Sequence, residues 1–362
     1  MSSQVNDVIS TEKVDILIVC CDIGGAKAIY PVFKLLKKKF NIKIICTVYS
    51  KEVFRGFSNK IILELDHSTD YLSRILYNIN PKLLFTGTSE FSNLERLSWK
   101  VSREMGIVSV AIIDSWTNPK DRFKYYYSES NSNTELSQPD VVSVPDQMLK
   151  SKIFKGGWCT SDLKVCGQPH LEQNLRKLLR SRNASNILKG ATLFISEPVS
   201  EKCHTLGEDI GYSQFSVATK IVNEVLSDIS ILEIKPHPKE NIDNWIKWKK
   251  LFSEEEQLKI KISKSKLENL ITKSEVVVGM ASMGLIEAAY SGAKVMALQP
   301  NRKFIPNIFI DECEYISLII NNDRMDNIFQ LLRGNKNHSI NIKNLPFYKS
   351  IERTSNLILK YL

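Results

Sequence analysis

A histidine stands between two prolines in the segment EIKPHPKE, and a lysine flanks the prolines on each side. The residues ILEI before Lys235 are strand formers, so His237 is expected at the carboxyl end of a buried strand. Pro236 and Pro238 fix their own φ angles and restrict their neighbours, which leaves the imidazole little entropy to lose on binding. The lysines favour anions, and an imidazole can donate a hydrogen bond to a phosphate. The pattern alone fits a phosphate contact and an ordinary proline turn about equally.

A second strand end, in SEVVVGMASMGLIEAAYSGAKVMALQPNR, has the residue types of a phosphate-binding turn. A buried strand runs into small residues, and a helix is expected to begin near Met283 with Ser282 as its N-cap. The free N–H groups and the dipole of a helix start can hold a phosphate. Glu287 follows about one turn into the helix, within reach of a ribose beside that phosphate. A capped helix with a solvated glutamate is the alternative, and the histidine one strand earlier favours the phosphate site.

Strands and helices alternate along the whole chain, which determines where these strand ends lie. Strands are expected at residues 14–21, 42–49, 61–65, 82–87, 107–113, 140–145, 191–198, 231–236, 274–280 and 293–300, and helices near 26–40, 91–105, 213–227, 241–254, 284–292 and 347–361. Such alternation indicates parallel sheets with right-handed crossover connections. The polar and aromatic stretch at 117–138 has no periodicity and is predicted to be a long loop.

The alternation occurs twice, which predicts an α/β protein of two doubly wound, Rossmann-like domains that face a cleft. The predicted parts are an N-terminal domain at 1–170, a linker helix at 171–189, a C-terminal domain at 190–346 and a C-terminal helix at 347–362. Open α/β sheets bind ligands at the carboxyl edge of their strands. Both motifs described above are therefore expected at a ligand-binding edge.

The composition agrees with this organisation. A chain of 362 residues exceeds what one core usually holds, and 43% hydrophobic with 25% charged residues is ordinary for a soluble protein. No apolar run is long enough to span a membrane, and the N-terminus lacks the apolar segment of a secretory signal. The seven cysteines show no paired or metal-binding spacing, so a reducing cytoplasm is the predicted location. No metal-ligand cluster, DxD motif or phosphate-binding loop is present, so neither a metal nor a cofactor is predicted.

The net charge of +9 suits an anionic ligand, nucleic acid or an anionic membrane surface, and it does not choose among them. The basic run at 175–182 could touch an anionic membrane, although a solvated helix face explains it as well.

The KPHP motif followed by SMGLIEAAYSGAKV resembles the C-terminal domain of GT-B glycosyltransferases. The nearest groups are bacterial enzymes of capsule and lipopolysaccharide assembly: sialyltransferase-like and Kdo-transferase-like proteins and CDP-glycerol glycerophosphotransferases. In these groups a His-Pro pair and a serine-rich helix start hold the nucleotide phosphate, which implies this role for His237, Pro238 and Ser282. The acidic residue of the equivalent helix commonly binds the ribose, which points to Glu287. The segment VCGQPH is similar to a Gly-x-Pro element that closes the first domain in GT-B proteins and UDP-N-acetylglucosamine 2-epimerases.

The resemblance implies that the N-terminal half holds the acceptor and the catalytic base. Asp114 ends the strand VSVAII, where an inverting transferase needs a group that takes the proton of the acceptor hydroxyl. Partial burial would raise the pKa of this carboxyl into a useful range. An Asx-turn that caps Thr117 or Asn118 is the alternative for Asp114. Arg122 is expected to pair with a phosphate or an acidic sugar, or else to lie on the surface beside Asp121.

Two further strand ends in this half are predicted to contact the acceptor. Gly24 and Gly25 form a turn after the first strand and let the backbone approach a ligand, but the pattern is not GxGxxG. Thr88 and Ser89 lie in the small-residue turn TGTSE after another strand.

The predicted function is that of an inverting, metal-independent glycosyltransferase. It would move a sugar from a CMP- or UDP-linked donor to a surface-polysaccharide or other glycan acceptor, including a lipid-linked one. The enzyme would be cytoplasmic, either free or peripheral to the inner membrane, with no nucleic acid partner. The alternatives on the same fold are a sugar-nucleotide 2-epimerase-like or a CDP-glycerol glycerophosphotransferase-like enzyme, and less directly a non-enzymatic nucleotide-sugar binder. An epimerase should show several acids and histidines in its first domain, and His67 is the one histidine before residue 170.

Overall fold

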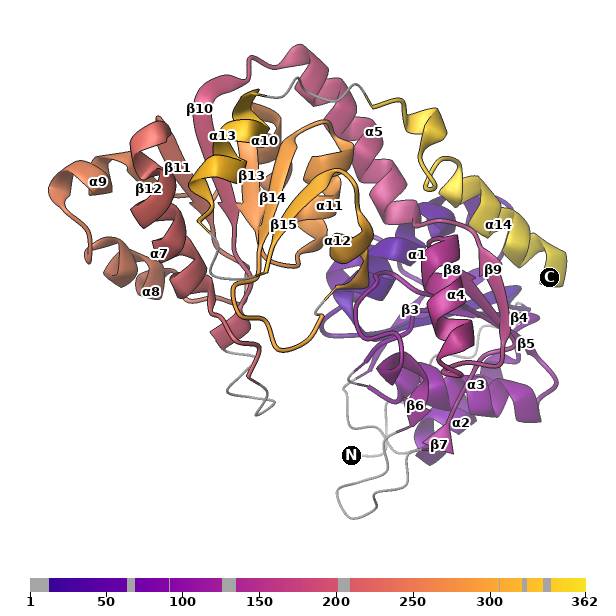
Figure 1. The fold of residues 1–362 in the computed structure, drawn as a ribbon. Coiled ribbons are helices and arrows are strands. Elements are labelled where there is room, and N and C mark those ends of the chain that lie inside the picture. Colours follow the sequence, from indigo (N-terminus) through magenta and orange to yellow (C-terminus); the bar gives the residue numbers. More distant parts are fainter. Residues whose placement is uncertain are drawn as a thin grey trace. The chain divides into compact units, whose positions relative to one another are not determined.

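The computed structural model describes residues 13–63, 69–90, 92–125, 135–200, 209–305, 307–320, 324–334 and 340–362. The chain divides into two compact units. The N-terminal unit comprises Met1–Gln173 and Lys343–Leu362, and the C-terminal unit comprises Asn174–Ile342. Each unit is a parallel sheet flanked by helices (Figure 1), which confirms the prediction of two Rossmann-like domains.

The sheet of the N-terminal unit has seven strands in the order β3-β2-β1-β4-β5-β8-β9, and every neighbouring pair is parallel. The strands are β1 (Ile16–Cys20), β2 (Ile42–Thr47), β3 (Lys60–Leu63), β4 (Leu83–Thr86), β5 (Val108–Ile112), β8 (Val141–Val144) and β9 (Asp162–Val165), and the helices are α1 (Ile23–Leu36), α2 (Thr69–Ile79), α3 (Leu94–Glu104), α4 (Gln147–Lys155) and α14 (Ser350–Tyr361). The central strand β1 is buried throughout because its residues are apolar on both faces. The strand order reverses between β1 and β4, and such a switch point is where open α/β sheets bind ligands.

The sheet of the C-terminal unit has six parallel strands in the order β12-β11-β10-β13-β14-β15. The strands are β10 (Leu188–Ile195), β11 (Ile231–Lys235), β12 (Ile260–Ile262), β13 (Ser274–Gly279), β14 (Lys294–Leu298) and β15 (Ile316–Ile319), and the helices are α5 (Pro169–Ala184), α7 (Gln214–Val225), α8 (Ile242–Lys249), α9 (Glu254–Lys259), α10 (Leu267–Lys273), α11 (Met283–Tyr290), α12 (Ile308–Glu312) and α13 (Asp326–Gly334). The switch point of this sheet lies between β10 and β13. A core that includes Phe194, Ile221, Trp245 and Phe329 joins β10 to α7, α8 and α13.

Several elements differ from the sequence-based expectation. Gly24 and Gly25 lie in the first turn of α1 and not in a loop, because Asp22 caps this helix earlier than expected. The predicted long loop at 117–138 contains a short 3-10 helix, Asp121–Phe123, and the two-residue strands β6 (Lys124–Tyr125) and β7 (Glu135–Leu136), while residues 126–134 lie outside the described part.

Candidate functional site

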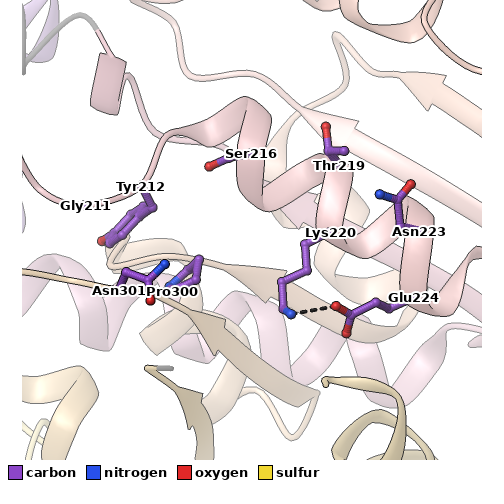
Figure 2. Close-up of a pocket in the computed structure, with 9 residues that line it drawn as sticks. All are labelled: Gly211, Tyr212, Ser216, Thr219, Lys220, Asn223, Glu224, Pro300 and Asn301. Carbon is purple, nitrogen blue, oxygen red and sulfur yellow. Dashed lines mark hydrogen bonds and ion pairs between the residues drawn. The ribbon is translucent and has the colours of Figure 1, made fainter. Parts of the chain in front are cut away.

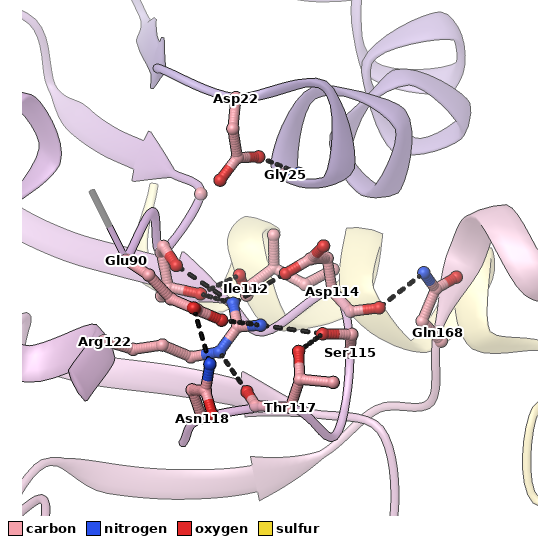
Figure 3. Close-up of polar contacts among 12 residues, drawn as sticks. Asp22, Gly25, Glu90, Ile112, Asp114, Ser115, Thr117, Asn118, Arg122 and Gln168 are labelled. Atoms are coloured by element: carbon pink, nitrogen blue, oxygen red, sulfur yellow. Dashed lines mark hydrogen bonds and ion pairs between the residues drawn. The ribbon is translucent and has the colours of Figure 1, made fainter. Parts of the chain in front are cut away.

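Three acidic side chains lie at the carboxyl edge of the N-terminal sheet, around its switch point (Figure 3). Asp22 follows β1, Glu90 follows β4 and Asp114 follows β5, and these strands are neighbours in the sheet. Asp22 is the N-cap of α1, and its Oδ1 accepts a hydrogen bond of 2.7 Å from the Gly25 backbone N–H. Asp22 was not among the predicted site residues, although it directly follows the apolar run of β1.

Arg122 organises this edge. Its side chain is 3% exposed, and its guanidinium bonds Asp114 Oδ1 at 2.7 Å and lies 3.4 Å from Glu90 Oε1. The same group donates to Thr88 Oγ1 at 3.0 Å and to Ser115 Oγ at 2.7 Å. The guanidinium also donates to the backbone carbonyls of Thr88 and Thr117. The alternative of a surface ion beside Asp121 is therefore wrong, because Arg122 is buried and its ion pairs are with Asp114 and Glu90.

Asp22 and Asp114 are neighbours across Gly24. A Cβ atom at Gly24 would overlap Asp114 Oδ2 and would lie 3.5 Å from Asp22 Oδ1. The glycine therefore makes room for a carboxylate of the protein itself. Burial, and then the charge of Asp114, raises the pKa of Asp22 to about 6. The two carboxylates differ because Asp114 has the guanidinium as a direct partner, whereas Asp22 has a single backbone N–H.

A fourth acid, Glu95 on α3, lies beneath this edge and is 1% exposed. Its Oε1 accepts a 2.7 Å hydrogen bond from the Cys21 N–H, so it fixes the backbone between β1 and Asp22. Its Oε2 is buried and has no hydrogen-bond partner among the described residues. Burial, and then the charge of Asp22, raises the pKa of Glu95 to about 8. Glu95 is therefore mostly a neutral acid at pH 7 and limits the negative charge at this position.

The remaining predicted residues of this half lie inside the protein. Thr88 and Ser89 are 1% and 2% exposed. Gly25 packs against the backbone of Gly87, because a Cβ atom on Gly25 would lie 3.3 Å from the Gly87 Cα. Gln168, from the VCGQPH segment, donates a 2.9 Å hydrogen bond to the Asp114 carbonyl and so helps to position that residue. An acceptor contact by Thr88 and Ser89 remains a prediction.

In the C-terminal unit, His237 lies in a turn that directly follows β11. Glu240 holds this turn, because its Oε2 accepts from the His237 N–H at 2.5 Å. The Lys239 N–H donates to His237 Nδ1 at 3.2 Å, so the neutral ring carries its proton on Nε2. The other Glu240 oxygen accepts from Ser196 Oγ at 2.8 Å and from the Trp245 indole at 3.3 Å. Glu240 and the two prolines thus fix the position of His237. Glu240 was not among the predicted site residues.

The turn that precedes α11 is held by side chains from three other segments. Glu197 accepts from the Ala281 N–H at 2.6 Å, Gln299 donates to the Met280 carbonyl at 2.8 Å, and Asn307 donates to the Ala281 carbonyl at 2.9 Å. Ser196 and Glu197 are consecutive at the end of β10, so one strand end fixes both the His237 turn and this turn. The backbone before α11 is therefore held by contacts within the protein itself.

Ser282 is the N-cap of α11, as predicted, and its Oγ accepts from the Gly284 N–H at 3.0 Å. Within the described part of the chain, the backbone N–H groups of Ser282 and Met283 have no acceptor. They are the donors that an anion at this helix start would engage. Glu287 is half-buried and accepts from the Asn174 amide at 3.0 Å, so its carboxylate is held from α5. Lys235 is half-buried at the end of β11, and Pro238 is exposed.

Two other expectations concern the described residues as a whole. No group of three or more potential metal ligands occurs among them. None of the helices in the described ranges is both long and apolar enough to cross a membrane. The basic run at 175–182 lies on α5, where Arg182 is 5% exposed and donates to the Ile271 and Ser274 carbonyls. Arg182 therefore stabilises the interior of the C-terminal unit and offers no charge to a membrane.

Comparison with known proteins gives structural matches only. No protein-family model and no curated protein sequence matches the chain. A UDP-GlcNAc 2-epimerase from Neisseria meningitidis bound to UDP-GlcNAc superposes with a TM-score of 0.60 and 13% identity, over 96% of this chain and 99% of that one. A structure of S. aureus MnaA with UDP has a TM-score of 0.60 and 12% identity, over 95% of this chain and 92% of that one.

The wall teichoic acid polymerase TagF, soaked with CDPG, superposes with a TM-score of 0.51 and 9% identity, over 97% of this chain and 89% of that one. These likenesses show the fold. The chain shares with these structures the GT-B fold, in which two Rossmann-like domains follow one another. The finer resemblance to sialyltransferase-like or Kdo-transferase-like proteins stays a prediction.

Proposed function

We propose that this protein is an enzyme that acts on a nucleotide-activated sugar. Nucleotide binding is assigned to the C-terminal unit, and proton transfer is assigned to the N-terminal unit. The observation that carries the proposal is the unequal pair Asp22 and Asp114, two neighbouring carboxylates of which Arg122 neutralises one. Two carboxyl groups in environments of different charge can serve as acid and base at the same pH.

The nucleotide phosphate would bind at the start of α11. The Ser282 and Met283 N–H groups donate to its oxygens, and His237 Nε2–H adds a side-chain donor. Because Glu240 and Glu197 already hold both turns, binding requires little ordering of the protein. Glu287 would accept from the ribose hydroxyls.

Epimerisation of the sugar is the reaction that this arrangement supports best. Inversion of a carbon that carries hydrogen requires one group to remove the proton and another to deliver it to the opposite face. Asp22 and Asp114 are our candidates for these two groups, because they are neighbouring carboxyl groups, and 2-epimerases are among the structures with the same fold. The three acids at this edge, with Glu95 beneath it, weaken the objection that the first domain has too few ionisable groups. UDP is the first nucleotide to test, and CMP and CDP are the alternatives.

Glycosyl transfer is the second candidate. A carboxyl group with a pKa near 6 at the end of β1 suits a base that takes the proton of an acceptor hydroxyl. In that case Asp22, or Asp114 as first predicted, is the base, and the acceptor is a surface-polysaccharide or lipid-linked glycan.

Calorimetry with UDP, CDP and CMP tests the nucleotide site. We expect micromolar to millimolar binding of at least one of them. His237→Ala should weaken it by about 1–3 kcal/mol, the scale of a charge-assisted hydrogen bond. Unchanged affinity in a His237→Ala protein with a normal melting curve would refute the role of this residue.

Proton NMR of the protein with UDP-GlcNAc in D2O separates the two reactions. Epimerisation gives a new nucleotide sugar that carries solvent deuterium, with no acceptor present. Transfer gives free nucleotide only after a glycan acceptor is added. Asp22→Asn and Asp114→Asn should each slow turnover roughly 100- to 10,000-fold and leave nucleotide affinity intact. Turnover at the wild-type rate in both variants would exclude this pair from the chemistry.

A further inference from the structure

A polar pocket that includes no residue of the His237 or Ser282 turns lies in the C-terminal unit (Figure 2). Its volume is about 340 Å³. One wall is a face of α7, and the other is formed by Gly211 and Tyr212 before this helix and by Pro300 and Asn301 after β14. None of the residues assigned to the nucleotide lines it.

The α7 wall follows directly from the sequence of that helix. The lining residues recur every three or four positions and so share one face: Ser216, Thr219, Lys220, Asn223 and Glu224. The intervening residues Val217, Ile221 and Val225 are fully buried in the core of the unit. The helix therefore presents a continuous polar face to the pocket, and its apolar face anchors it.

Two of these polar groups form fixed walls. Thr219 Oγ1 accepts from the Trp248 indole at 3.0 Å, and Ser216 Oγ is used in the capping box with Ser213. Three others have capacity left for a ligand. Lys220 has three N–H donors and gives one to Glu224 at 2.6 Å, and the amide side chains of Asn223 and Asn301 have no partner among the described residues.

The charge of the lining is balanced. Lys220 and Glu224 are 14% and 20% exposed and neutralise each other, and Glu224 Oε2 also accepts from the Met325 N–H at 2.7 Å. A phosphate or carboxylate would have to compete with Glu224 for the ammonium group. A neutral molecule with many hydroxyl groups would instead use the donors and acceptors without disturbing the ion pair.

The far wall is held in an unusual conformation. Asn301 has a φ of 57°, a left-handed backbone conformation that residues other than glycine rarely adopt. Gly211, with a φ of 96°, packs against the Asn301 carbonyl so closely that a Cβ atom there would clash with it. The Asn301 N–H donates to the Ile320 carbonyl at 2.7 Å. These contacts thus hold the backbone of Asn301 in place at the pocket wall.

We propose that this pocket binds a neutral glycan unit of one or two sugar residues. The volume is at the lower end of the roughly 300–1,000 Å³ that small-molecule sites occupy. Amide, ammonium and carboxylate groups match sugar hydroxyls, which both donate and accept, while Tyr212 and Pro300 supply apolar surface for the C–H faces of the ring. The site would let the enzyme hold a glycan apart from the nucleotide-linked sugar, and it does not depend on the proposed reaction.

Saturation-transfer difference NMR on the full chain tests the proposal. The probes are N-acetylglucosamine, galactose, N,N′-diacetylchitobiose and lactose, each measured with UDP in excess so that the nucleotide site is occupied. We expect at least one neutral sugar to bind. Asn301→Gly should weaken its binding about three- to tenfold, because glycine keeps the left-handed backbone and removes the amide. Asn223→Ala should act similarly, and Asn244→Ala, at an exposed asparagine on α8, is the matched control.

The outcomes separate the two proposals. Sugar binding that is lost in Asn301→Gly and Asn223→Ala, but kept in Asn244→Ala, supports the pocket even if no reaction is ever found. Binding that UDP abolishes, or that both pocket variants leave unchanged, places the sugar elsewhere and overturns the inference. Absence of binding by all four probes at concentrations up to tens of millimolar also overturns it.

Discussion

The two sheets present different chemistry at the edge where their strands end. The N-terminal edge is made of ionisable side chains: the acids Asp22, Glu90 and Asp114 surround the buried Arg122. The C-terminal edge is made of backbone donors, with the N–H groups at the start of α11 as its centre. Side chains there serve mainly to hold the backbone, as Glu197 does for Ala281.

This difference follows from what each edge has to stabilise. Buried carboxylates are unstable without a counter-charge, so the N-terminal edge requires Arg122 and leaves Asp22 with a raised pKa. Backbone N–H groups carry no net charge, so leaving them without an acceptor costs much less free energy than leaving a carboxylate without a counter-charge. One fold thus carries ionisable side chains at one sheet edge and uncharged backbone donors at the other.

Replacement of Arg122 should have the largest effect. Arg122→Met leaves the half-buried Asp114 and Glu90 without their cation, and we expect a loss of about 3 kcal/mol in the free energy of unfolding at pH 7.5. Lowering the pH to 5 should reduce the loss, because the carboxylates can then take up protons. Urea unfolding at the two pH values measures both effects.

Arg182→Met is the matched control in the other unit. Arg182 is also buried, but its partners are the backbone carbonyls of Ile271 and Ser274. Its loss should destabilise the protein to the same extent at pH 5 and pH 7.5. An equal pH dependence in the two variants would show that Arg122 does not act through the carboxylates.

The sequence predicts where the carboxyl edges of the two sheets lie better than it predicts which side chains contact the residues at those edges. Apolar runs such as β1 and small-residue turns such as that before α11 are local signals, so the strand ends at His237, Asp114 and Ser282 could be located. The short edge strands β12 and β15, of three and four residues, carry too little pattern to be detected.

The contacts that define the candidate site join distant residues. Glu197 and Ala281 are 84 positions apart, and Cys21 and Glu95 are 74 apart, so no local periodicity reveals them. Arg122 lies in a segment without periodicity, and its burial follows from tertiary packing alone. Asp22 is different: it stands directly after an apolar run, and the rule that selected Asp114 applies to it equally.

Asp22→Asn should change stability by less than Arg122→Met and in the opposite direction. The pKa of Asp22 in the folded protein, about 6, lies above the ordinary value of 3.8. Between pH 3.8 and about 6 the Asp22 carboxyl of the unfolded chain has already lost its proton, whereas the same carboxyl in the folded protein still holds it. Raising the pH through this range therefore lowers the free energy of unfolding, and the decrease ends near pH 6. Asparagine keeps the N-cap and cannot ionise.

We therefore expect Asp22→Asn to stabilise the protein by an amount on the order of 2 kcal/mol at pH 7.5 and by almost nothing at pH 4. Thermal unfolding across this range measures the difference. A variant that is more stable and yet inactive would identify Asp22 as a residue kept for chemistry. A destabilised variant at pH 7.5 would contradict the raised pKa.

The smallest effect is expected at Ser282, and it tests whether the C-terminal edge binds an anion or only caps a helix. Ser282→Ala should cost about 1 kcal/mol of stability. Ser253→Ala, which removes the N-cap of α9 in the same unit, should cost a similar amount. The nucleotide affinity measured by calorimetry should fall in Ser282→Ala and stay unchanged in Ser253→Ala. Loss of the Ser282 hydroxyl loosens the N–H groups that are proposed to hold the phosphate. Helix α9 is distant from these groups in sequence and shares none of their contacts. Equal nucleotide affinity in the two variants would reduce Ser282 to a helix cap and would leave His237 as the only tested donor at that edge.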